Sequence, residues 1–316
     1  MRIPLAALAL LVAPPALALT PEDVRGAAYE GGALPDGQSG LAFTLQVLLD
    51  RAGVSPGVID GYKGGMTETA LRAFEAREGL EVDGVLDAAA WEALRGPGAA
   101  PAIQDHTLTE ADVSDLTDAI PDDYAEMAEM EALGFTSVAE RLAERFHMDE
   151  DVLRALNPDA AFEAGETIAV AAPGERLEGE VARIEVRKGE GRLVAFDAED
   201  AILADYPVTI GSAQTPSPEG TVEVTAVALD PTYTYRPDVN FQQGDNDEAL
   251  ILPPGPNGPV GAVWIDLSEP TYGIHGTPEP AQLFEAASHG CVRMTNWDAE
   301  ELANLVGQGV TVEFVE

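Results

Sequence analysis

Basic residues and cysteine are scarce in this chain, and both shortages restrict what it can do. Its 316 residues hold one cysteine, and 17 lysine and arginine residues stand against 56 acidic ones, for a formal net charge of −39. One cysteine cannot form an internal disulfide and stays a free thiol. Such a negative surface repels nucleic acid and anionic lipid, so we expect neither as a partner. We interpret the acidic surface as a means of keeping the protein soluble in a salty habitat, because salt there screens the surface charges and shortens their reach.

Long apolar runs are also absent, except at the start of the chain. Met1-Arg2 precede an apolar stretch over residues 3–17, and the small-residue site Ala16-Leu17-Ala18 leads into polar sequence. This order is typical of a secretory signal peptide over residues 1–18, cut near Ala18. An uncleaved anchor is the alternative, but the stretch is short for a membrane span and Pro14-Pro15 interrupts it. We therefore expect an exported protein with no membrane span.

Helical periodicity follows over residues 38–96. Apolar residues around Leu45 mark a first helix, Thr67 is expected to cap a second, and a third surrounds Trp91. The stretch resembles the small three-helix peptidoglycan-binding module through Ile59-Asp60-Gly61, Gly64, Thr67, Ala70, Phe74, Gly79-Leu80, Asp83-Gly84 and Trp91. Glu75 stands where that family commonly has glutamine. If this side chain touches the ligand, the resemblance implies altered or lost binding.

A second module is expected after a linker over residues 97–121. Residues 122–175 have the pattern of two helices and a strand. They resemble a LysM-type cell-wall-binding repeat through Leu153, Leu156-Asn157-Pro158 and Gly165 with the apolar strand that follows. A helical spacer that only positions the next domain is the alternative, and the residues favour neither.

The periodicity changes from helical to strand-like at Val181. Short apolar runs between glycine, proline and aspartate turns predict a sheet-rich domain over residues 180–316. One late helix interrupts the strands, and either Asn296 or Asp298 can cap it. A half-buried strand is expected after this helix.

The single cysteine and two of the four histidines stand close together in this domain. His275 lies in Tyr272-Gly273-Ile274-His275-Gly276-Thr277, and Cys291 in Ser288-His289-Gly290-Cys291-Val292-Arg293-Met294. The pattern resembles the L,D-transpeptidases, the cysteine enzymes that cross-link bacterial peptidoglycan. The resemblance continues through Leu252-Pro253-Pro254-Gly255-Pro256-Asn257-Gly258-Pro259-Val260-Gly261, Trp264-Ile265-Asp266-Leu267 and Asn296-Trp297-Asp298-Ala299. Many members carry a glycine shortly before the cysteine motif, where this chain reads Gln282-Leu283-Phe284-Glu285.

The resemblances together imply a multidomain α+β protein. A small three-helix peptidoglycan-binding module is expected first and a LysM-like α/β segment second. The C-terminal domain is expected to be a β-sandwich of the L,D-transpeptidase type, with the catalytic loop at one edge.

Cys291 needs a base before it can act as a nucleophile. A free thiol with a pKa of about 8.5 is only a few per cent thiolate at neutral pH. The residues alone allow either histidine to be that base. The resemblance implies that His275 takes the proton, that the carbonyl of Gly276 orients it, and that His289 supports the loop. The backbone N–H groups of Gly290 and Cys291 are expected to form the oxyanion hole, because glycine permits close approach.

Four further side chains are candidates for contact with substrate: Ser288, Arg293, Tyr235 and Trp264. Arg293 suits a carboxylate of the peptide stem, although an internal salt bridge is an equal alternative in so acidic a chain. Tyr235 and Trp264, like Tyr233, either line the cleft or belong to the core. We expect no metal and no other cofactor.

These features predict a periplasmic, cell-wall-associated L,D-transpeptidase that is a monomer and has peptidoglycan as its partner. It would cross-link tetrapeptide stems through a cysteine acyl-enzyme. Release of the same acyl-enzyme by water would instead make it an L,D-carboxypeptidase or a cross-link hydrolase. A non-catalytic cell-wall-binding protein is the alternative from another class, and the pairing of His275 with Cys291 argues against it.

Overall fold

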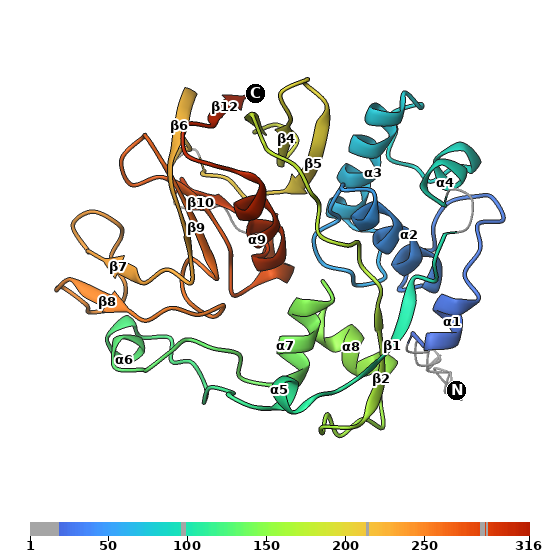
Figure 1. Ribbon diagram of the computed structural model, residues 1–316, viewed down its shortest axis with the longest axis horizontal. Helices are drawn as coiled ribbons and strands as arrows, with labels where there is room; N and C mark the ends of the chain where they lie inside the picture. Colours follow the sequence, from blue (N-terminus) through green and yellow to red (C-terminus); the bar gives the residue numbers. More distant parts are fainter. Residues whose placement is uncertain (1–18, 96–98, 213–214, 285–287, 289) are drawn as a thin grey trace, which may run out of the picture.

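Three units follow one another along the chain in the computed structural model, which describes residues 19–95, 99–212, 215–284, 288 and 290–316. A helical unit comes first, a two-helix unit with a small sheet second, and a larger sheet unit last, and all three line one central cavity (Figure 1). The expected signal peptide lies outside the described residues. Within the described ranges, no helix is both long and apolar enough to span a membrane.

The first unit confirms the predicted helical region. Its helices are α1 (Pro21–Arg25), α2 (Gly40–Arg51), α3 (Gly65–Glu78) and α4 (Ala88–Arg95). The helices α2, α3 and α4 bury apolar side chains in a core that includes Leu45, Leu71, Phe74 and Trp91, whereas α1 buries Val24 in the core of the second unit. Thr67 does not cap the second long helix, because α3 already begins at Gly65 and its N-cap is Gly64.

Glu75 is an internal residue of this unit. Its side chain is 2% exposed, and its carboxylate accepts hydrogen bonds from the N–H groups of Asp83 and Gly84, both at 2.9 Å. The carboxylate therefore holds the turn that leads into α4. This side chain is therefore buried inside the fold and does not lie on a surface where it could touch a ligand.

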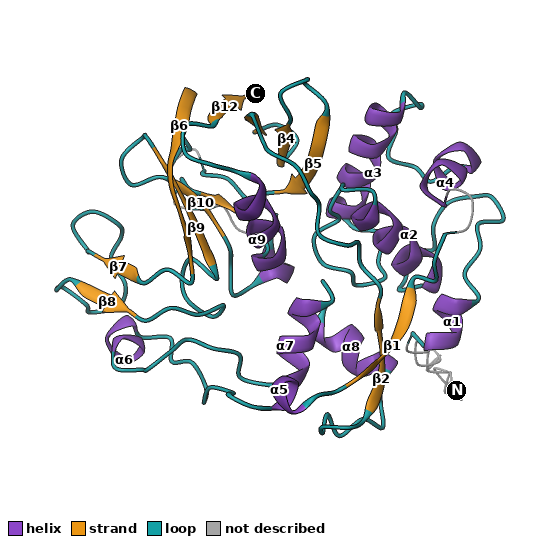
Figure 2. Ribbon diagram, viewed as in Figure 1, coloured by secondary structure: helices purple, strands orange, loops and turns teal. Residues whose placement is uncertain are grey.

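The second unit contains a strand where the sequence predicted only a linker. Its elements are β1 (Ile103–Thr107), α5 (Glu110–Val113), α6 (Tyr124–Ala128), α7 (Val138–Arg145), α8 (Glu150–Leu156) and β2 (Thr167–Ala171). β1 pairs antiparallel with β2 and closes the sheet against α7 and α8. Asn157 ties α8 to β2, because its side chain bonds both the N–H and the carbonyl of Ala169 at 2.7 and 2.8 Å. In contrast, α6 lies beside the β7–β8 hairpin of the third unit (Figure 2).

In the described residues, the third unit contains an eight-stranded sheet, a separate two-stranded hairpin, one α-helix and one short 3-10 helix. Its elements are β3 (Arg183–Arg187), β4 (Arg192–Phe196), β5 (Ile202–Pro207), β6 (Gly220–Leu229), β7 (Tyr233–Tyr235), β8 (Leu250–Leu252), β9 (Val263–Leu267), β10 (Gly273–His275), η1 (Pro280–Gln282), β11 (Val292–Arg293), α9 (Asn296–Leu305) and β12 (Thr311–Val315). Thr295 caps α9 by accepting a hydrogen bond from the N–H of Asp298 at 3.1 Å, so neither predicted cap residue has that role. The apolar face of α9 fills the concave side of the sheet.

The strands form one curled sheet where the sequence predicted a β-sandwich. The described order is β11-β10-β9-β6-β12-β3-β4-β5, with β7 and β8 as a separate hairpin. The long strand β6 pairs with β12 through its first residues and with β9 through its last ones, and the register shifts between Val224 and Ala226. A bulge increases the local bend of a strand. β6 therefore turns a single sheet around α9, and two packed sheets are not needed to enclose the core.

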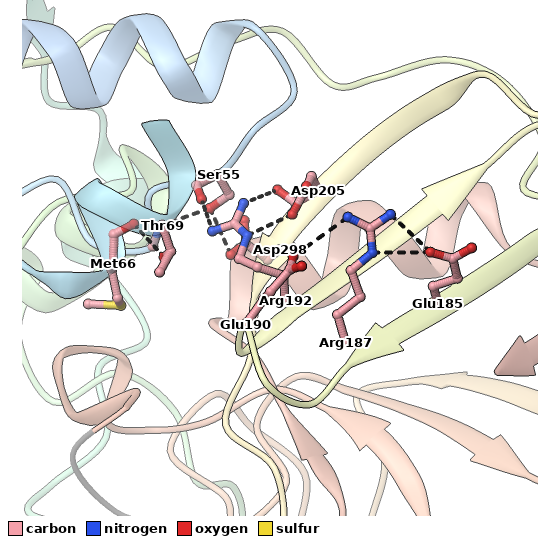
Figure 3. Close-up of polar contacts among 10 residues, drawn as sticks. Ser55, Met66, Thr69, Glu185, Arg187, Glu190, Arg192, Asp205 and Asp298 are labelled. Atoms are coloured by element: carbon pink, nitrogen blue, oxygen red, sulfur yellow. Dashed lines mark hydrogen bonds and ion pairs between the residues drawn. The ribbon is translucent and has the colours of Figure 1, made fainter. Parts of the chain in front are cut away.

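The first unit joins the third through hydrogen bonds of Ser55 around an ion pair that is buried in the third unit (Figure 3). Arg192, which is 1% exposed, donates to the Asp205 carboxylate at 2.7 Å and to the carbonyl of Ser55 at 3.0 Å. Ser55 also donates from its hydroxyl to Asp298 at 2.9 Å. Its N–H bonds the carbonyl of Asp205 at 2.8 Å, so the α2–α3 loop extends the edge of β5. The helical unit is consequently fixed to the sheet unit.

Candidate active site

Cys291 and His275 come from adjacent strands at one edge of the curled sheet. β10 and β11 pair in parallel, with Ile274 opposite Val292 and His275 opposite Arg293. Side chains alternate along a strand, so Cys291, Arg293 and His275 project from the same face. The thiol and the imidazole are therefore diagonal neighbours on this face.

His275 is held as a neutral base by its surroundings. The side chain is 6% exposed, and its Nδ1 bonds the carbonyl of Gly276 at 2.7 Å, which leaves Nε2 as the acceptor. Burial lowers the pKa of His275 to about 4; the bond to Gly276 opposes this change, and the Arg293 charge adds to it. The imidazole is consequently uncharged at neutral pH and able to take a proton.

Cys291 is half-buried, and its thiol is not activated in advance. Burial raises the pKa of the Cys291 thiol, while a hydrogen bond from the N–H of Gly273 and the charge of Arg293 act in the opposite direction. The thiol donates weakly to the carbonyl of Thr271 at 3.8 Å. The resting pair is thus a thiol beside a neutral imidazole, and an ion pair is not favoured.

Asn296 explains why glycine follows the histidine. Its amide oxygen accepts a hydrogen bond from the N–H of Ala262 at 3.1 Å and leaves no room for a side chain at Gly276. Its amide nitrogen donates to Glu144 of α7 at 3.2 Å. Asn296 of α9 therefore packs against Gly276, whose carbonyl orients His275. Asn296 also bonds Glu144 and so connects this part of the site to the second unit. The sequence resemblance included Asn296 but gave it no role.

Ser288 and Gly290 differ from their predicted roles. Ser288 is 3% exposed, and its hydroxyl donates to the carbonyl of Cys291 at 2.5 Å and accepts from the N–H of Gly290 at 3.1 Å. Ser288 therefore braces the loop and is not free to bind substrate. The N–H of Gly290 is already engaged and does not form an open oxyanion hole in this structure. His289 lies outside the described residues.

Gly290 has a clear steric requirement for glycine. Its φ is +113°, and a Cβ atom there would come within 2.6 Å of the Tyr272 ring. Both facts explain why the sequence has glycine here, because a side chain would collide with the ring and strain the backbone.

The two aromatic candidates lie in different surroundings. Trp264 stacks on His275 with ring centroids 5.6 Å apart, and its indole N–H donates to Asp266 at 3.1 Å. Tyr235 is fully buried, and its hydroxyl bonds Asn246 and Gln243. The prediction that Tyr235 lines the cleft is thus wrong, because this side chain is the core of the β7–β8 hairpin. Trp264 contacts the candidate base.

Arg293 is the half-buried cation of the site. Among the described residues, no carboxylate forms an ion pair with it; Glu279 is near enough only for a longer-range attraction. The internal salt bridge that was an alternative for Arg293 is therefore not found in the described part of the chain. The guanidinium is left available for an anionic ligand.

Phe284 lies in the loop where many members of the family carry a glycine shortly before the cysteine motif. Its φ is +74°, in the left-handed region that glycine favours, and its N–H donates to Thr209 at 3.0 Å. The Phe284 ring packs against Gly191, where a Cβ atom would lie 3.0 Å from it. The chain thus keeps the backbone conformation of a glycine while placing a large side chain there.

Comparisons with known proteins identify the family of this chain. The L,D-transpeptidase catalytic domain matches residues 181–314, and a peptidoglycan binding domain matches residues 41–94. A Bacillus licheniformis protein named L,D-transpeptidase YkuD is 32% identical over 177 residues, which cover 55% of this chain and 90% of that protein. The chain belongs to the L,D-transpeptidase family.

Two further comparisons involve more distant proteins. An Escherichia coli protein named L,D-transpeptidase ErfK/SrfK is 30% identical over 142 residues, which cover 42% of this chain and 45% of that protein. The crystal structure of an L,D-transpeptidase from Xylanimonas cellulosilytica aligns over 90% of this chain and 95% of its own, at 15% identity and a TM-score of 0.38. So low a score adds nothing to the family assignment. This L,D-transpeptidase therefore combines a family catalytic domain with a peptidoglycan-binding domain; the LysM-like character of the second unit stays a prediction.

Proposed function

We propose that this family member forms peptidoglycan cross-links through an acyl-enzyme on Cys291. The observation that carries the proposal is the placement of Cys291 and His275 on one face of neighbouring strands, with Nδ1 of His275 bonded to Gly276. Because Nδ1 is occupied by that bond, Nε2 is the nitrogen that can act as a general base. The match to a peptidoglycan binding domain supports the substrate class.

The first half of the reaction forms a thioester. Nε2 of His275 takes the thiol proton as the sulfur attacks the carbonyl at the L-centre of a meso-diaminopimelate residue. The carbonyl carbon then loses its bond to the nitrogen of the terminal D-alanine, which leaves with the proton that His275 returns. In the second half, an amine of another stem loses a proton to His275 and attacks the thioester. The new amide forms, and the thiol is restored.

The negative oxygen that develops during attack needs fixed donors. The N–H of Gly290 bonds Ser288 at 3.1 Å, so it would have to leave that partner to serve. We assign the N–H of Cys291 as the first donor and that of Gly290 as a second one recruited on acylation. Loss of one such donor typically slows an acyl-transfer enzyme by about 10² to 10³.

Replacement of the nucleophile tests the mechanism. Cys291→Ala should abolish turnover of purified disaccharide-tetrapeptides and Cys291→Ser nearly so, because the reaction needs a polarisable thiolate; both variants should melt within a few degrees of the wild type. The family resemblance also implies that a carbapenem adds once to the chain, on Cys291, as peptide mass spectra would show. Turnover that survives in Cys291→Ala would rule the mechanism out.

The products of the same assay distinguish the acceptors. Cross-linked dimers indicate transpeptidation, whereas free tripeptides indicate release by water. With a periplasmic location, as the expected signal peptide suggests, the helical unit would hold the enzyme on the wall.

A further inference from the structure

A segment of the second unit is attached to the hairpin beside the candidate site. Residues 120–134, here called the strap, carry α6 and cross the β7–β8 hairpin (Figure 1). Apolar strap residues join the hairpin in one small core: Ile120, Tyr124, Met127, Met130 and Leu133 of the strap pack with Tyr233, Tyr235, Leu250 and Leu252. The strap is thus part of the catalytic unit in space, although it precedes the family match in sequence.

Hydrogen bonds fasten the strap at both ends. At the first end, Gln243 accepts from the N–H of Tyr124 at 3.2 Å and donates to the carbonyl of Asp122 at 2.8 Å. At the second end, the N–H of Leu133 donates to Pro254 at 2.9 Å and its carbonyl accepts from Asn257 at 3.0 Å. The loop that holds Leu133 also meets the site, because the carbonyl of Pro256 accepts from Asn296 at 3.3 Å.

Tyr124 is the strap residue that reaches the site. Its ring meets Tyr235 and Tyr233 edge-on, with centroids 5.3 and 6.1 Å apart. Burial raises the pKa of Tyr124 to about 12, with Tyr235 adding to the change and the nearby Arg293 charge opposing it. Burial also raises the pKa of Tyr233, and the Cys291 charge is among the neighbours that add to this rise. The aromatic cluster therefore lies within electrostatic range of both Arg293 and Cys291.

Two polar groups in this cluster have unused hydrogen-bonding capacity. Within the described residues, the Tyr124 hydroxyl and the Arg293 guanidinium form no hydrogen bond or ion pair, whereas the Tyr235 hydroxyl is fully used. A half-buried guanidinium and a neutral phenol, both donors, together suit a carboxylate. In a chain with a net charge of −39, such a pair also provides local attraction where the overall field repels anions.

We propose that Tyr124 is a positioning and specificity residue, whose hydroxyl and Arg293 jointly bind a carboxylate of the peptide stem. This inference rests on the proposed function, since it deepens the same site. The second unit then contributes a wall of the cleft, in addition to any binding of the cell wall.

Tyr124→Phe tests the proposal, because it removes only the hydroxyl and keeps the ring in the hairpin core. The KM for a soluble disaccharide-tetrapeptide should rise about tenfold to a hundredfold with kcat nearly unchanged, as for loss of a hydrogen bond to a charged group. Donors amidated at one stem carboxylate each should identify the group bound: amidation at that carboxylate should weaken the wild type and leave Tyr124→Phe unaffected. Tyr62→Phe, an exposed tyrosine of the first unit, is the matched control.

The outcomes separate this proposal from the proposed function. If Tyr124→Phe has the KM of the wild type, or if it responds to every amidation as the wild type does, the subsite is wrong. If the wild type turns over no stem at all, the transpeptidase proposal fails. The subsite is then decided by calorimetric binding of the tetrapeptide and its amidated forms to Cys291→Ser, with and without Tyr124→Phe. Equal affinities in the two backgrounds would overturn it.

Discussion

Burial determines the resting charge of both reactive side chains. It lowers the pKa of His275 to about 4 and raises that of Cys291, so the pair is uncharged at neutral pH. A neutral thiol is protected from indiscriminate oxidation and alkylation, because the thiolate is the reactive form. Proton transfer to His275 must then accompany attack on the substrate.

The acid side of the pH profile tests this state. His275 acts as a base only when neutral, so kcat/KM should stay nearly constant from about pH 7 down to pH 5 and fall only near pH 4. The measurement is kcat/KM for a soluble stem peptide, with circular dichroism at each pH as the control for folding. An apparent pKa near 6.5 would mean that the imidazole is solvated and that the burial argument is wrong.

Phe284 offers a second test at the scale of one residue. A non-glycine residue at φ +74° costs roughly 1 kcal/mol, which glycine avoids. Phe284→Ala keeps this strain and loses the contact with Gly191, whereas Phe284→Gly loses the contact but relieves the strain. Chemical denaturation should therefore find the glycine variant more stable than the alanine variant by about 0.5–1 kcal/mol. The opposite order would show that the loop relaxes out of the left-handed region.

The sequence indicates part of the geometry of the candidate site and does not reveal the rest. The motif names Cys291 and His275, and strand alternation places them on one face. It does not reveal that the Ser288 hydroxyl is used by backbone groups or that Tyr235 is buried, because a residue type does not say which partners it finds. Tyr124 carries no local signal, since its neighbours in space come from a hairpin far along the chain.

At the scale of elements, the strand β1 lies in the expected linker over residues 97–121, and most of the strap lies in the stretch that was expected to form the LysM-like module. β1 reads Ile103-Gln104-Asp105-His106-Thr107, with one buried apolar residue, because one face of its two-stranded sheet is solvated. The apolar alternation that identifies longer strands is therefore missing. The helices α2, α3 and α4 were predictable because each has an apolar face, whereas the short helix α1, which buries Val24, was not predicted.

Leu133 tests whether the strap and the hairpin form one element. It is fully buried between Tyr235 and Leu252, so Leu133→Ala should lower the free energy of unfolding by about 2–5 kcal/mol. Hydrogen exchange should speed up at residues 233–235 and 250–252 more than in β3 and β4. Leu116→Ala, at a side chain that is 39% exposed, is the control. Uniform acceleration across the sheet unit would contradict a local role of the strap.

At the scale of the whole molecule, residues of all three units line a cavity of about 570 Å³, and several of these residues are acidic. The cavity does not include Cys291 or His275. His147 of the second unit bonds Asp50 of the first at 2.8 Å and stacks on Trp297 of the third. Removal of residues 19–175 would therefore uncover Arg192 and Asp205 and delete the strap. Such a truncation should impair catalysis as well as wall binding.

The buried titratable groups where the three units meet, here called the junction, give a pH dependence of stability with a definite sign. Burial raises the pKa of Asp298 to about 7 and that of Glu144 to about 8, above the values near 4 of unfolded chains. Burial lowers the pKa of His147, but the charge and hydrogen bond of Asp50 and the charges of Asp298 and Glu301 together outweigh this effect, so the net change is a rise. Between about pH 5 and 8 the folded chain thus holds more protons than the unfolded chain, and the free energy of unfolding must fall as pH rises.

The melting temperature should consequently decrease from pH 5.5 to pH 8, and Asp298→Asn with Glu144→Gln should flatten that slope. Glu248→Gln, at an exposed carboxylate that does not line the cavity, is the control and should leave the slope unchanged. Repeating the series in 0.5 M salt separates the junction from the general surface charge, since salt screens exposed groups far more than buried ones. A melting temperature that rises with pH, or a slope that the double variant retains, would show that these carboxyls are solvated and that the units separate freely.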